Sequence, residues 1–240
     1  MAQRPPSPVE RILVVAAHPD DIDFGAAGSV ATWTAEGIDV AYCIVTDGDA
    51  GGSDRGVTRA DMARLRREEQ TAAAGCVGVT DLSFLGHPDG RLESTLEVRR
   101  DIARVIRRVR PQRVVAPSPE RNWQRIFASH PDHLAAGVAA IAAVYPDSRN
   151  PFAHPELLDE GLEPHTVEEL WMMAFPDPDT WVDVTEQFDR KVRALQCHRS
   201  QVGGWEDLPD AMRQWGTAIA RQGGLPDGHL AEAFRVISAV

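Results

Sequence analysis

The chain has 240 residues, of which 43% are hydrophobic and 25% charged, a composition that is ordinary for a folded globular protein. Its formal net charge of -11 repels the phosphate backbone of nucleic acids, and no stripe of lysine and arginine interleaved with aromatic residues reverses this locally. No apolar stretch approaches the length needed to cross a bilayer, and the Pro-rich start "MAQRPPSPVE" does not resemble a signal peptide, so we expect a cytoplasmic protein that binds neither nucleic acid nor membrane.

The first part of the chain alternates between strand patterns and helix patterns. An apolar run over 11–17 predicts a buried strand, and the small and apolar residues of 24–37 predict the helix that follows it. The alternation continues with strands over 39–48, 81–86 and 113–118 and with helices over 59–75, 98–110 and 130–145. Capping boxes are expected before two of these helices, at Thr58 with Asp61 and at Ser94 with Glu97. Such repeats predict an α/β fold with a mostly parallel sheet and helices on both faces.

The rest of the chain is less regular. Residues 146–164 carry four prolines and little periodicity, which predicts a long surface loop rather than a domain boundary. Beyond this loop, strands are expected over 168–175 and 180–185 and an amphipathic helix over 186–201. Residues 202–228 are rich in glycine, proline and tryptophan, and their pattern predicts no element.

A polar turn, "HPDD" at 18–21, follows the first predicted strand. In open α/β sheets ligands bind beyond the carboxyl ends of the strands, so the location favours a site. A dinucleotide would need G-x-G-x-x-G here, and an imidazole with two carboxylates would obstruct a pyrophosphate. From this tetrapeptide alone a structural turn stays open, with Pro19 fixing the bend and Asp20 or Asp21 capping the next helix.

A second polar motif, "HPDH" at 130–133, also lies just beyond a predicted strand and begins a helix, with Ser129 as the expected N-cap. His130 and His133 share a helix face, and the sheet topology can bring them to the end of the first strand. Two imidazoles and one carboxylate with an open fourth position make a hydrolytic zinc site. The other histidines are expected to be surface or hydrogen-bonded residues, namely His87, His154, His165, His198 and His229.

Several motifs in order along the chain carry a family resemblance. "AHPDD" after the first strand, "TDGDAGG" after the second, "RREEQTAAAGCVGV", "HPDG" and "HPDH" resemble the GlcNAc-phosphatidylinositol de-N-acetylase-like family, also called PIG-L or LmbE-like. The resemblance covers about positions 11 to 140. It implies a Rossmann-like fold and zinc-dependent hydrolysis of an N-acyl amide, most often an acetamido group on a sugar. A set of two histidines and one aspartate would also accept Fe2+ in place of Zn2+.

The same resemblance implies roles for individual residues. His18, Asp21 and His133 match the zinc ligands of the family, Asp20 its general base, and His130 the histidine that steadies the oxyanion. Arg66, paired with Glu69, and Asp89 look like its sugar-binding residues. For these two, the structural alternatives are an exposed helix salt bridge for Arg66 and a turn-capping role for Asp89.

One departure from the family pattern bears on the substrate. The branch that acts in mycothiol synthesis has a tyrosine two residues before "HPDH", where this chain has Ala128, and the neighbouring Phe127 has no hydroxyl group to replace it. This argues against a mycothiol enzyme. Bacillithiol-type, chitooligosaccharide-type and antibiotic-tailoring deacetylases stay open, and so does a homo-oligomeric state.

The expected reaction removes an N-acetyl or other N-acyl group from an amino-sugar-containing small molecule or glycoconjugate, releasing acetate and a free amine. Asp20 is expected to take a proton from water, and Asp132 to hold His130 in its protonated form beside the oxyanion. Two other classes stay open: a metal-dependent phosphoesterase, which a second metal ion per chain would favour, and a non-catalytic sugar-binding module on the same fold. The presence of Asp20 and His130 argues against the latter, because binding requires neither.

For the domain organisation, we expect a flexible tail over 1–10 and a single deacetylase domain over 11–240. Within this domain, 11–145 would form the βα core with the metal site, and 146–240 a loop-rich part that shapes the substrate pocket. The long loop and the Trp-rich segment of that second part are the expected pocket walls.

Overall fold

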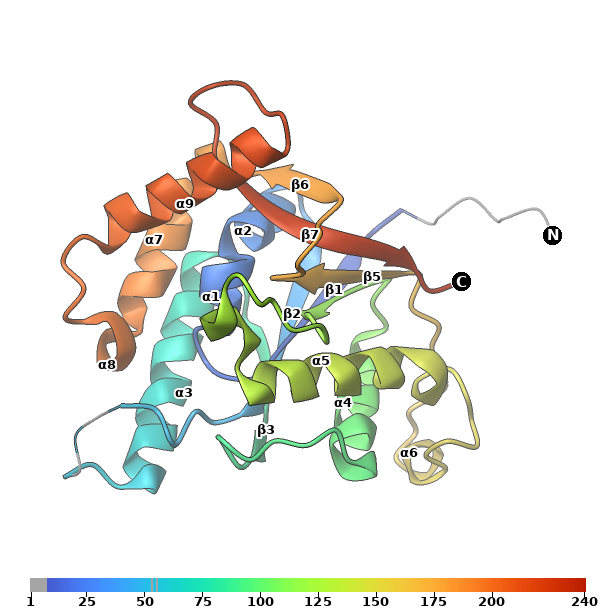
Figure 1. Ribbon diagram of the computed structural model, residues 1–240. Helices are drawn as coiled ribbons and strands as arrows, with labels where there is room; N and C mark the ends of the chain where they lie inside the picture. The colour runs from blue at the N-terminus through green and yellow to red at the C-terminus, as the bar shows by residue number, and fades with distance from the viewer. Residues whose placement is uncertain (1–7, 53, 55) are drawn as a thin grey trace.

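A seven-stranded sheet forms the centre of the molecule in the computed structural model, which describes residues 8–240 except 53 and 55 (Figure 1). The strands lie in the order β3-β2-β1-β4-β5-β7-β6. They are β1 (Arg11–Ala16), β2 (Asp39–Thr46), β3 (Asp81–His87), β4 (Arg113–Pro117), β5 (Glu169–Met173), β6 (Thr180–Asp183) and β7 (Ala231–Ser238). The first five pair in parallel, whereas β7 runs antiparallel to both β5 and β6. The predicted mostly parallel sheet is confirmed.

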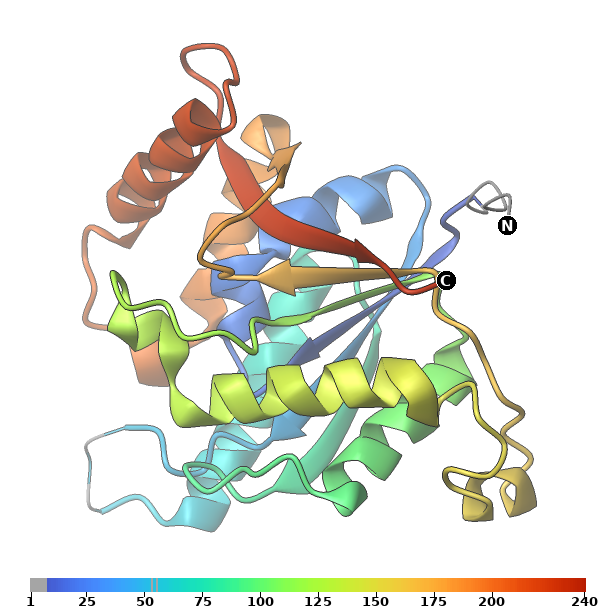
Figure 2. The same ribbon diagram turned by 45° about the vertical axis from the view of Figure 1, so that its right-hand side comes forward.

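Helices cover both faces of this sheet, as predicted (Figure 2). They are α1 (Asp21–Gly25), α2 (Ala27–Ala35), α3 (Arg59–Cys76), α4 (Leu96–Val109), α5 (Pro131–Ala142), α6 (Glu156–Asp159), α7 (Phe188–Cys197), α8 (Arg199–Val202) and α9 (Leu208–Gln222). On one face α4 and α5 pack against the strands; on the other, α1, α2, α3 and α7 do, and α9 packs beside α7. Of the helices in the described part of the chain, none is long and apolar enough to cross a membrane.

The continuous apolar run of β1 follows from this two-sided cover. Successive side chains of a strand point to opposite faces, so Leu13 joins the core under α4 and α5 while Val14 joins the core under α2. Both are fully buried, and burying a side chain of this size stabilises the fold by about 1.5–3 kcal/mol. A strand covered on both faces therefore has no polar alternation, and its first polar residues come where the sheet ends.

The helix starts differ in part from the expectations. Thr58 caps α3 by accepting from the Asp61 backbone N–H, as predicted. The box expected at Ser94 is wrong, because the cap of α4 is Thr95, which accepts from the Val98 N–H. The helix expected over 24–37 is two helices, α1 and α2, which meet at Ala26.

The C-terminal part, expected to be rich in loops, contributes three strands and several helices. The segment 202–228, for which the pattern predicts no element, holds the whole of α9, and β7 is a strand that the sequence pattern did not predict. The irregular segment 146–164 contains the short α6 and is held by the buried Arg107, whose guanidinium donates to the carbonyls of Asp147, Ser148, Asn150 and Leu162. This segment is thus tied to α4, away from the carboxyl ends of the strands (Figure 2).

Candidate metal and catalytic site

The two polar motifs meet at the carboxyl ends of neighbouring parallel strands. "HPDD" directly follows β1, and "HPDH" begins α5, which a loop and a short 3₁₀ turn (Ile126–Ser129) connect to β4. Close contact of α5 with the end of β4 depends on Gly137, because a Cβ atom there would lie 2.5 Å from the Pro117 carbonyl oxygen. The structure therefore brings the two motifs together, as the topology argument expected.

The three expected metal ligands, His18, Asp21 and His133, form a compact group. His18 Nδ1 lies 3.3 Å from His133 Nε2. Asp21 Oδ2 lies 3.4 Å from His18 Nδ1, and Asp21 Oδ1 lies 2.9 Å from His133 Nε2. The His130 ring lies edge-on to His18, with 5.1 Å between the ring centroids, and is exposed on the open side of the group. Together the three histidines bring ring nitrogens close enough to share one ion.

Each of these donors is oriented through its other polar atom. His133 Nδ1 lies 3.4 Å from the Ala128 carbonyl oxygen, and His18 Nε2 lies 3.0 Å from Asp89 Oδ1 and 3.3 Å from Asp132 Oδ2. Asp21 Oδ2 accepts from the backbone N–H of His18. A histidine that donates from one ring nitrogen in this way presents the lone pair of the other, which is the arrangement that metal-binding histidines use.

Asp132 and Asp89 therefore both contact His18 at Nε2, the ring nitrogen that faces away from His133. The Asp132 carboxylate accepts from the backbone N–H groups of Gly90 and Leu92 and faces His18, so the expectation that it holds His130 is wrong. Asp89 also accepts from the Ala50 N–H. Its side chain is engaged within the site rather than free as a turn cap.

His130 has a different environment from the one expected. Its Nδ1 accepts from the Asp132 backbone N–H at 3.2 Å, so His130 is the N-cap of α5 in place of Ser129, whose hydroxyl accepts from the Asn122 N–H instead. Partial burial and the nearby charges of His18 and His133 lower the pKa of His130. A lowered pKa favours the neutral ring, and because Nδ1 accepts a hydrogen bond, the proton of a neutral ring lies on Nε2.

Asp20 occupies a strained position beside the ligand group. Its φ of 90° lies in the left-handed region, which is uncommon for residues other than glycine, and its side chain makes no capping bond to α1. The carboxylate instead accepts from Arg66 at 3.0 Å. Burial raises the pKa of Asp20 to about 6, against the lowering effect of Arg66. The helix-capping alternative for Asp20 is therefore wrong.

Arg66 is buried, so the exposed salt bridge considered for it is wrong as well. Besides Asp20, its guanidinium donates to the backbone carbonyls of Pro19 and Gly48. Glu69, its expected partner, accepts from the backbone and hydroxyl of Ser200 instead. In this structure Arg66 holds the turn that carries Asp20, and its sugar-binding role stays a prediction.

A buried network that the sequence did not suggest supports the same turn. His198 Nε2 lies 2.8 Å from Asp23 Oδ2, which accepts from Gln70 Nε2, and Gln70 Oε1 accepts from the backbone N–H of Asp20. Both Asp23 and His198 are fully buried. The only sequence signals were a carboxylate inside an apolar helix pattern and a glutamine one helical turn after Arg66 on the same face.

A cavity of about 490 Å³ opens beside Asp21 and His133. Its remaining walls are mostly apolar and aromatic, and come from α1, β4, β5, the loop before α5, and the region around α9: Phe24, Gly25, Pro117, Ser118, Arg125, Phe127, Ala128, Met173, Ala174, Trp205, Met212 and Trp215. Trp205, Met212 and Trp215 of the Trp-rich segment line this cavity, and the role of this segment in a substrate pocket stays a prediction. The segment 146–164 contributes no residue to it.

Comparison with known proteins connects this geometry to a family. The family model PIG-L, described as GlcNAc-PI de-N-acetylase, matches residues 13–144. The chain is 34% identical over 233 residues to the diacetylchitobiose deacetylase of Thermococcus kodakarensis, covering 97% of this chain and 85% of that protein. The solved structure of N,N'-diacetylchitobiose deacetylase from Pyrococcus horikoshii has a TM-score of 0.87 at 29% identity, over 97% of this chain and 85% of that one.

Another relative carries a different name. The 4-oxalmesaconate hydratase of Pseudomonas putida is 28% identical over 227 residues, covering 91% of this chain and 84% of that protein. The assignment of a family thus rests on the whole set of matches, while the reaction must be argued from the site. A family model matches more than half of this chain, and a relative aligns with nearly all of it. The chain therefore belongs to the PIG-L family of GlcNAc-PI de-N-acetylases.

Proposed function

We propose that this protein is a metal-dependent hydrolase that removes an N-acetyl group from an amino-sugar-containing small molecule and releases acetate and a free amine. One observation carries the proposal: a carboxylate with a raised pKa, Asp20, stands in a strained turn next to the His18, Asp21 and His133 donors, with His130 on their open side. The named deacetylases among the relatives support the same reaction class.

The residues present fit a single metal ion. His18 Nδ1, an Asp21 oxygen and His133 Nε2 would hold Zn2+, or Fe2+, since two imidazoles and a carboxylate leave the open position of a catalytic site. Once bound, the ion would polarise the amide carbonyl and make a nearby water more acidic. The surplus of carboxylates around His18 also favours a cation here.

Asp20 would act as the general base. With a pKa of about 6 it is ionised at neutral pH, yet it is a much stronger base than an ordinary carboxylate. Arg66 and the Gln70 contact fix the carboxylate and its backbone, so the proton of the attacking water is taken at one place. The protonated Asp20 then supplies the proton that the departing amine requires.

His130 would stabilise the negative charge that develops on the carbonyl oxygen. Because its Nδ1 accepts from the Asp132 N–H, Nε2 carries the proton and is the atom available for donation. A fixed donor of this kind is already oriented before the reaction, which is the condition for oxyanion stabilisation. The lowered pKa of His130 favours a neutral donor in this role, whereas the sequence analysis expected an imidazolium.

The rival classes are less well supported by the site. A two-metal phosphoesterase would need the second potential group, His18 with Asp89 and Asp132, which shares His18 with the first group. A binding module would have no need for a strained turn at Asp20. A hydratase, suggested by the named Pseudomonas relative, adds water to a double bond and releases no acetate, so product analysis separates it.

The test is a product assay on the protein reconstituted with zinc or with iron. N-Acetylglucosamine, N,N'-diacetylchitobiose and simple N-acetylglucosaminides are incubated with it, and acetate and primary amine are measured separately. Equal amounts of both products, absent after chelation and restored by metal, are expected. Amine and acetate production that stays at the chelated level with every substrate and either metal would overturn the proposal.

A further inference from the structure

Arg125 has an unusual environment for a partly buried arginine. Its guanidinium makes no hydrogen bond or ion pair with any residue that the structure describes, although its backbone N–H donates to Asn122. Every other partly buried or buried arginine in the described part of the chain donates to a carboxylate or carbonyl group or, as Arg235 does with Asp179, forms an ion pair. Arg113 is the closest parallel, because it also lies over two rings, those of Trp33 and Trp171, yet it donates to Glu169 at 2.9 Å.

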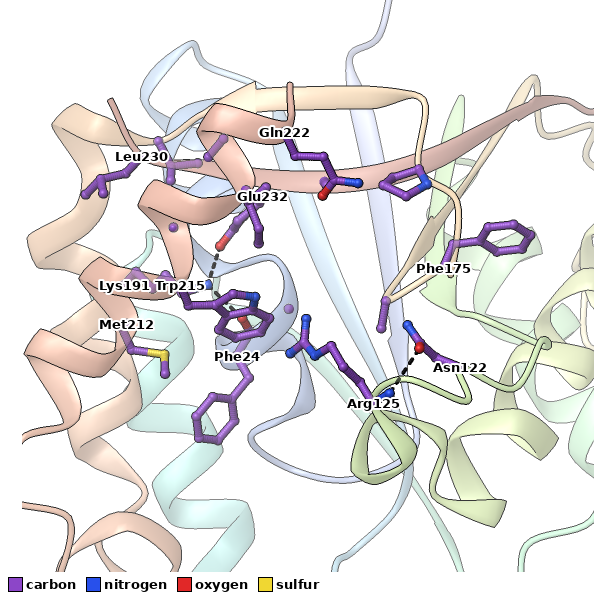
Figure 3. A pocket seen from close by; sticks show the side chains of 18 of the residues that line it. Phe24, Asn122, Arg125, Phe175, Lys191, Met212, Trp215, Gln222, Leu230 and Glu232 are labelled. Carbon is purple, nitrogen blue, oxygen red and sulfur yellow. Dashed lines mark hydrogen bonds and ion pairs between the residues drawn. The ribbon is translucent and has the colours of Figure 1, made fainter. Parts of the chain in front are cut away.

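Aromatic side chains hold Arg125 in place. The centre of its guanidinium lies 4.8 Å from the Trp215 ring centroid and 5.3 Å from that of Phe127. Figure 3 shows the side chain extending from the loop before α5 across the pocket toward Trp215, which comes from α9. Rings can hold a guanidinium through cation–π contacts while leaving its in-plane N–H donors free.

These donors are available in the cavity that adjoins the proposed reaction centre. Arg125 lines the cavity of about 490 Å³ together with Asp21 and His133, and it also lines a smaller adjoining cavity of about 210 Å³. In the smaller cavity the other cation, Lys191, is already engaged by Glu232 and the Phe24 carbonyl. Among the described residues that line these two cavities, Arg125 is therefore the cation whose charged group has no hydrogen-bonded or ionic partner.

A partly buried guanidinium without a hydrogen-bonding partner destabilises the folded protein unless a ligand accepts its hydrogen bonds. Burial lowers the pKa of Arg125, and no carboxylate opposes the effect. The chain does not lack acidic residues, since its net charge is -11. Asp21 and Glu232 line the two cavities, but no described carboxylate pairs with the Arg125 guanidinium, so a negatively charged ligand can take that place.

We propose that the substrate carries an anionic group, a carboxylate or a phosphate, joined to the N-acylated amino sugar through an apolar or aromatic portion, and that Arg125 binds this anion. The inference rests on the proposed function, because it places the sugar amide at Asp20 and His130. The apolar portion contacts the rings and methionines of the cavity, and the planar guanidinium accepts two oxygens side by side. Arg125 is thus a specificity-determining residue, separate from the groups that act on the amide.

The experiment compares aryl glycosides of N-acetylglucosamine that differ only at one ring position. The 4-carboxyphenyl and 4-phosphophenyl glycosides carry the anion, and the 4-carboxamidophenyl glycoside is the neutral match in shape. For the wild type we expect kcat/KM to favour an anionic glycoside by about 10–100-fold, the range that a hydrogen-bonded charge contributes, mostly through KM. The preferred anion identifies the carboxylate or the phosphate as the natural group.

Three variants assign this preference to Arg125. Arg125→Met should abolish it, and Arg125→Lys should keep part of it, because a charge remains without the planar fork. Arg121→Met is the matched control, since Arg121 is an exposed arginine of the same loop that also lies over a ring, that of Trp123, and its loss should leave the preference unchanged. A ratio of two substrates within one variant does not depend on the fraction of folded protein.

Equilibrium binding of the same three glycosides, followed by tryptophan fluorescence, separates this inference from the proposed function. Anion-selective binding that Arg125→Met abolishes, without turnover of any glycoside, would refute the deacetylase and keep the anion site. Equal kcat/KM and equal affinity for the charged and neutral glycosides, or no binding of any, would overturn the anion site. So would an equal fall in kcat for all three glycosides in Arg125→Met, because Arg125 would then act on the amide itself.

Discussion

Two clusters of buried charge, one at Lys191 and Glu232 and one around His18, differ in how their charges are balanced. In the first, Lys191 donates to Glu232 and to the Phe24 carbonyl, while Glu232 accepts from the backbone N–H groups of Gly28 and Ser29. One cation pairs with one anion. The anion also accepts hydrogen bonds from the first turn of α2, where a negative charge is favourable. This cluster is complete within the protein, and its expected role is structural.

The second cluster surrounds His18 and is not complete. Burial lowers the pKa of His18, but the charge of Asp21 and hydrogen bonds with Asp132, Asp21 and Asp89 outweigh it and raise the pKa to about 12. So many carboxylates around one imidazole make this cluster favourable for a bound cation. The comparison teaches that burial of a charged group does not by itself indicate a functional site. A buried charge that no group of the protein balances does indicate one.

The largest expected effect is on turnover, and it comes from the incomplete cluster. Asp20→Asn removes the proposed base while keeping a residue that tolerates the left-handed conformation, and should lower kcat by about 10²–10⁴-fold with metal content unchanged. Steady-state kinetics on the metal-loaded protein measures this. Asp39→Asn, at the exposed start of β2, is the control. Near-normal turnover in Asp20→Asn would refute the assignment of the base.

Breaking the complete cluster should affect stability instead. Lys191→Met leaves Glu232 buried without its cation, which should cost about 3–5 kcal/mol in the free energy of unfolding. Urea denaturation measures it, with the exposed Arg193→Met on the same helix as control. The double variant Lys191→Met with Glu232→Gln should recover part of the loss. Unchanged stability together with lost metal would mean that this cluster belongs to the functional site.

A smaller effect is expected from the residues behind His18. Asp89→Asn weakens the acceptor of the His18 Nε2 proton, and partners of this kind typically contribute about 10–100-fold in metal affinity. Competition with a chromogenic chelator gives the dissociation constant of the metal. If Asp89 only binds sugar, as the family resemblance implied, KM would rise while metal affinity stayed at the wild-type value.

The smallest effect concerns pH. Since Asp20 has a pKa of about 6, kcat/KM should fall as the pH drops through 6 and the base becomes protonated. Arg66 lowers this pKa, so Arg66→Met should move the acid limb to higher pH. Arg67 lies on the same helix as Arg66, is half-exposed and pairs with Asp47. Arg67→Met should therefore leave the acid limb of the pH profile in place. An unmoved limb in Arg66→Met would show that another group controls it.

The positions of the candidate residues could be predicted because the end of a buried strand is visible in the sequence as the end of an apolar run. The apolar run of β1 had to end at His18, and a parallel order of strands had to bring the α5 start to the same edge. The environments of these residues did not follow. His130 as a helix cap, Asp132 facing His18 and the burial of Arg66 depend on side-chain directions and on room left by the glycine loop at Gly48.

The missed elements have a related explanation. Helix α9 contains Gly216 and has Pro209 in its first turn. Glycine and proline lower the helix signal, even though proline in the first turn loses no hydrogen bond. Its burial against α7, through Met212 and Leu195, supplies the stability that local propensity does not. Contacts between distant segments of this kind leave no mark in a local pattern.

The most direct test of the incomplete cluster is metal content per chain, measured by plasma mass spectrometry on untagged protein purified without chelator. Wild type and Asp20→Asn should each hold close to one zinc or iron ion, and Asp21→Ala, checked for folding by circular dichroism, should hold almost none. Equal metal in wild type and Asp21→Ala, or none in either after reconstitution, would contradict the metal site and with it the proposed hydrolase.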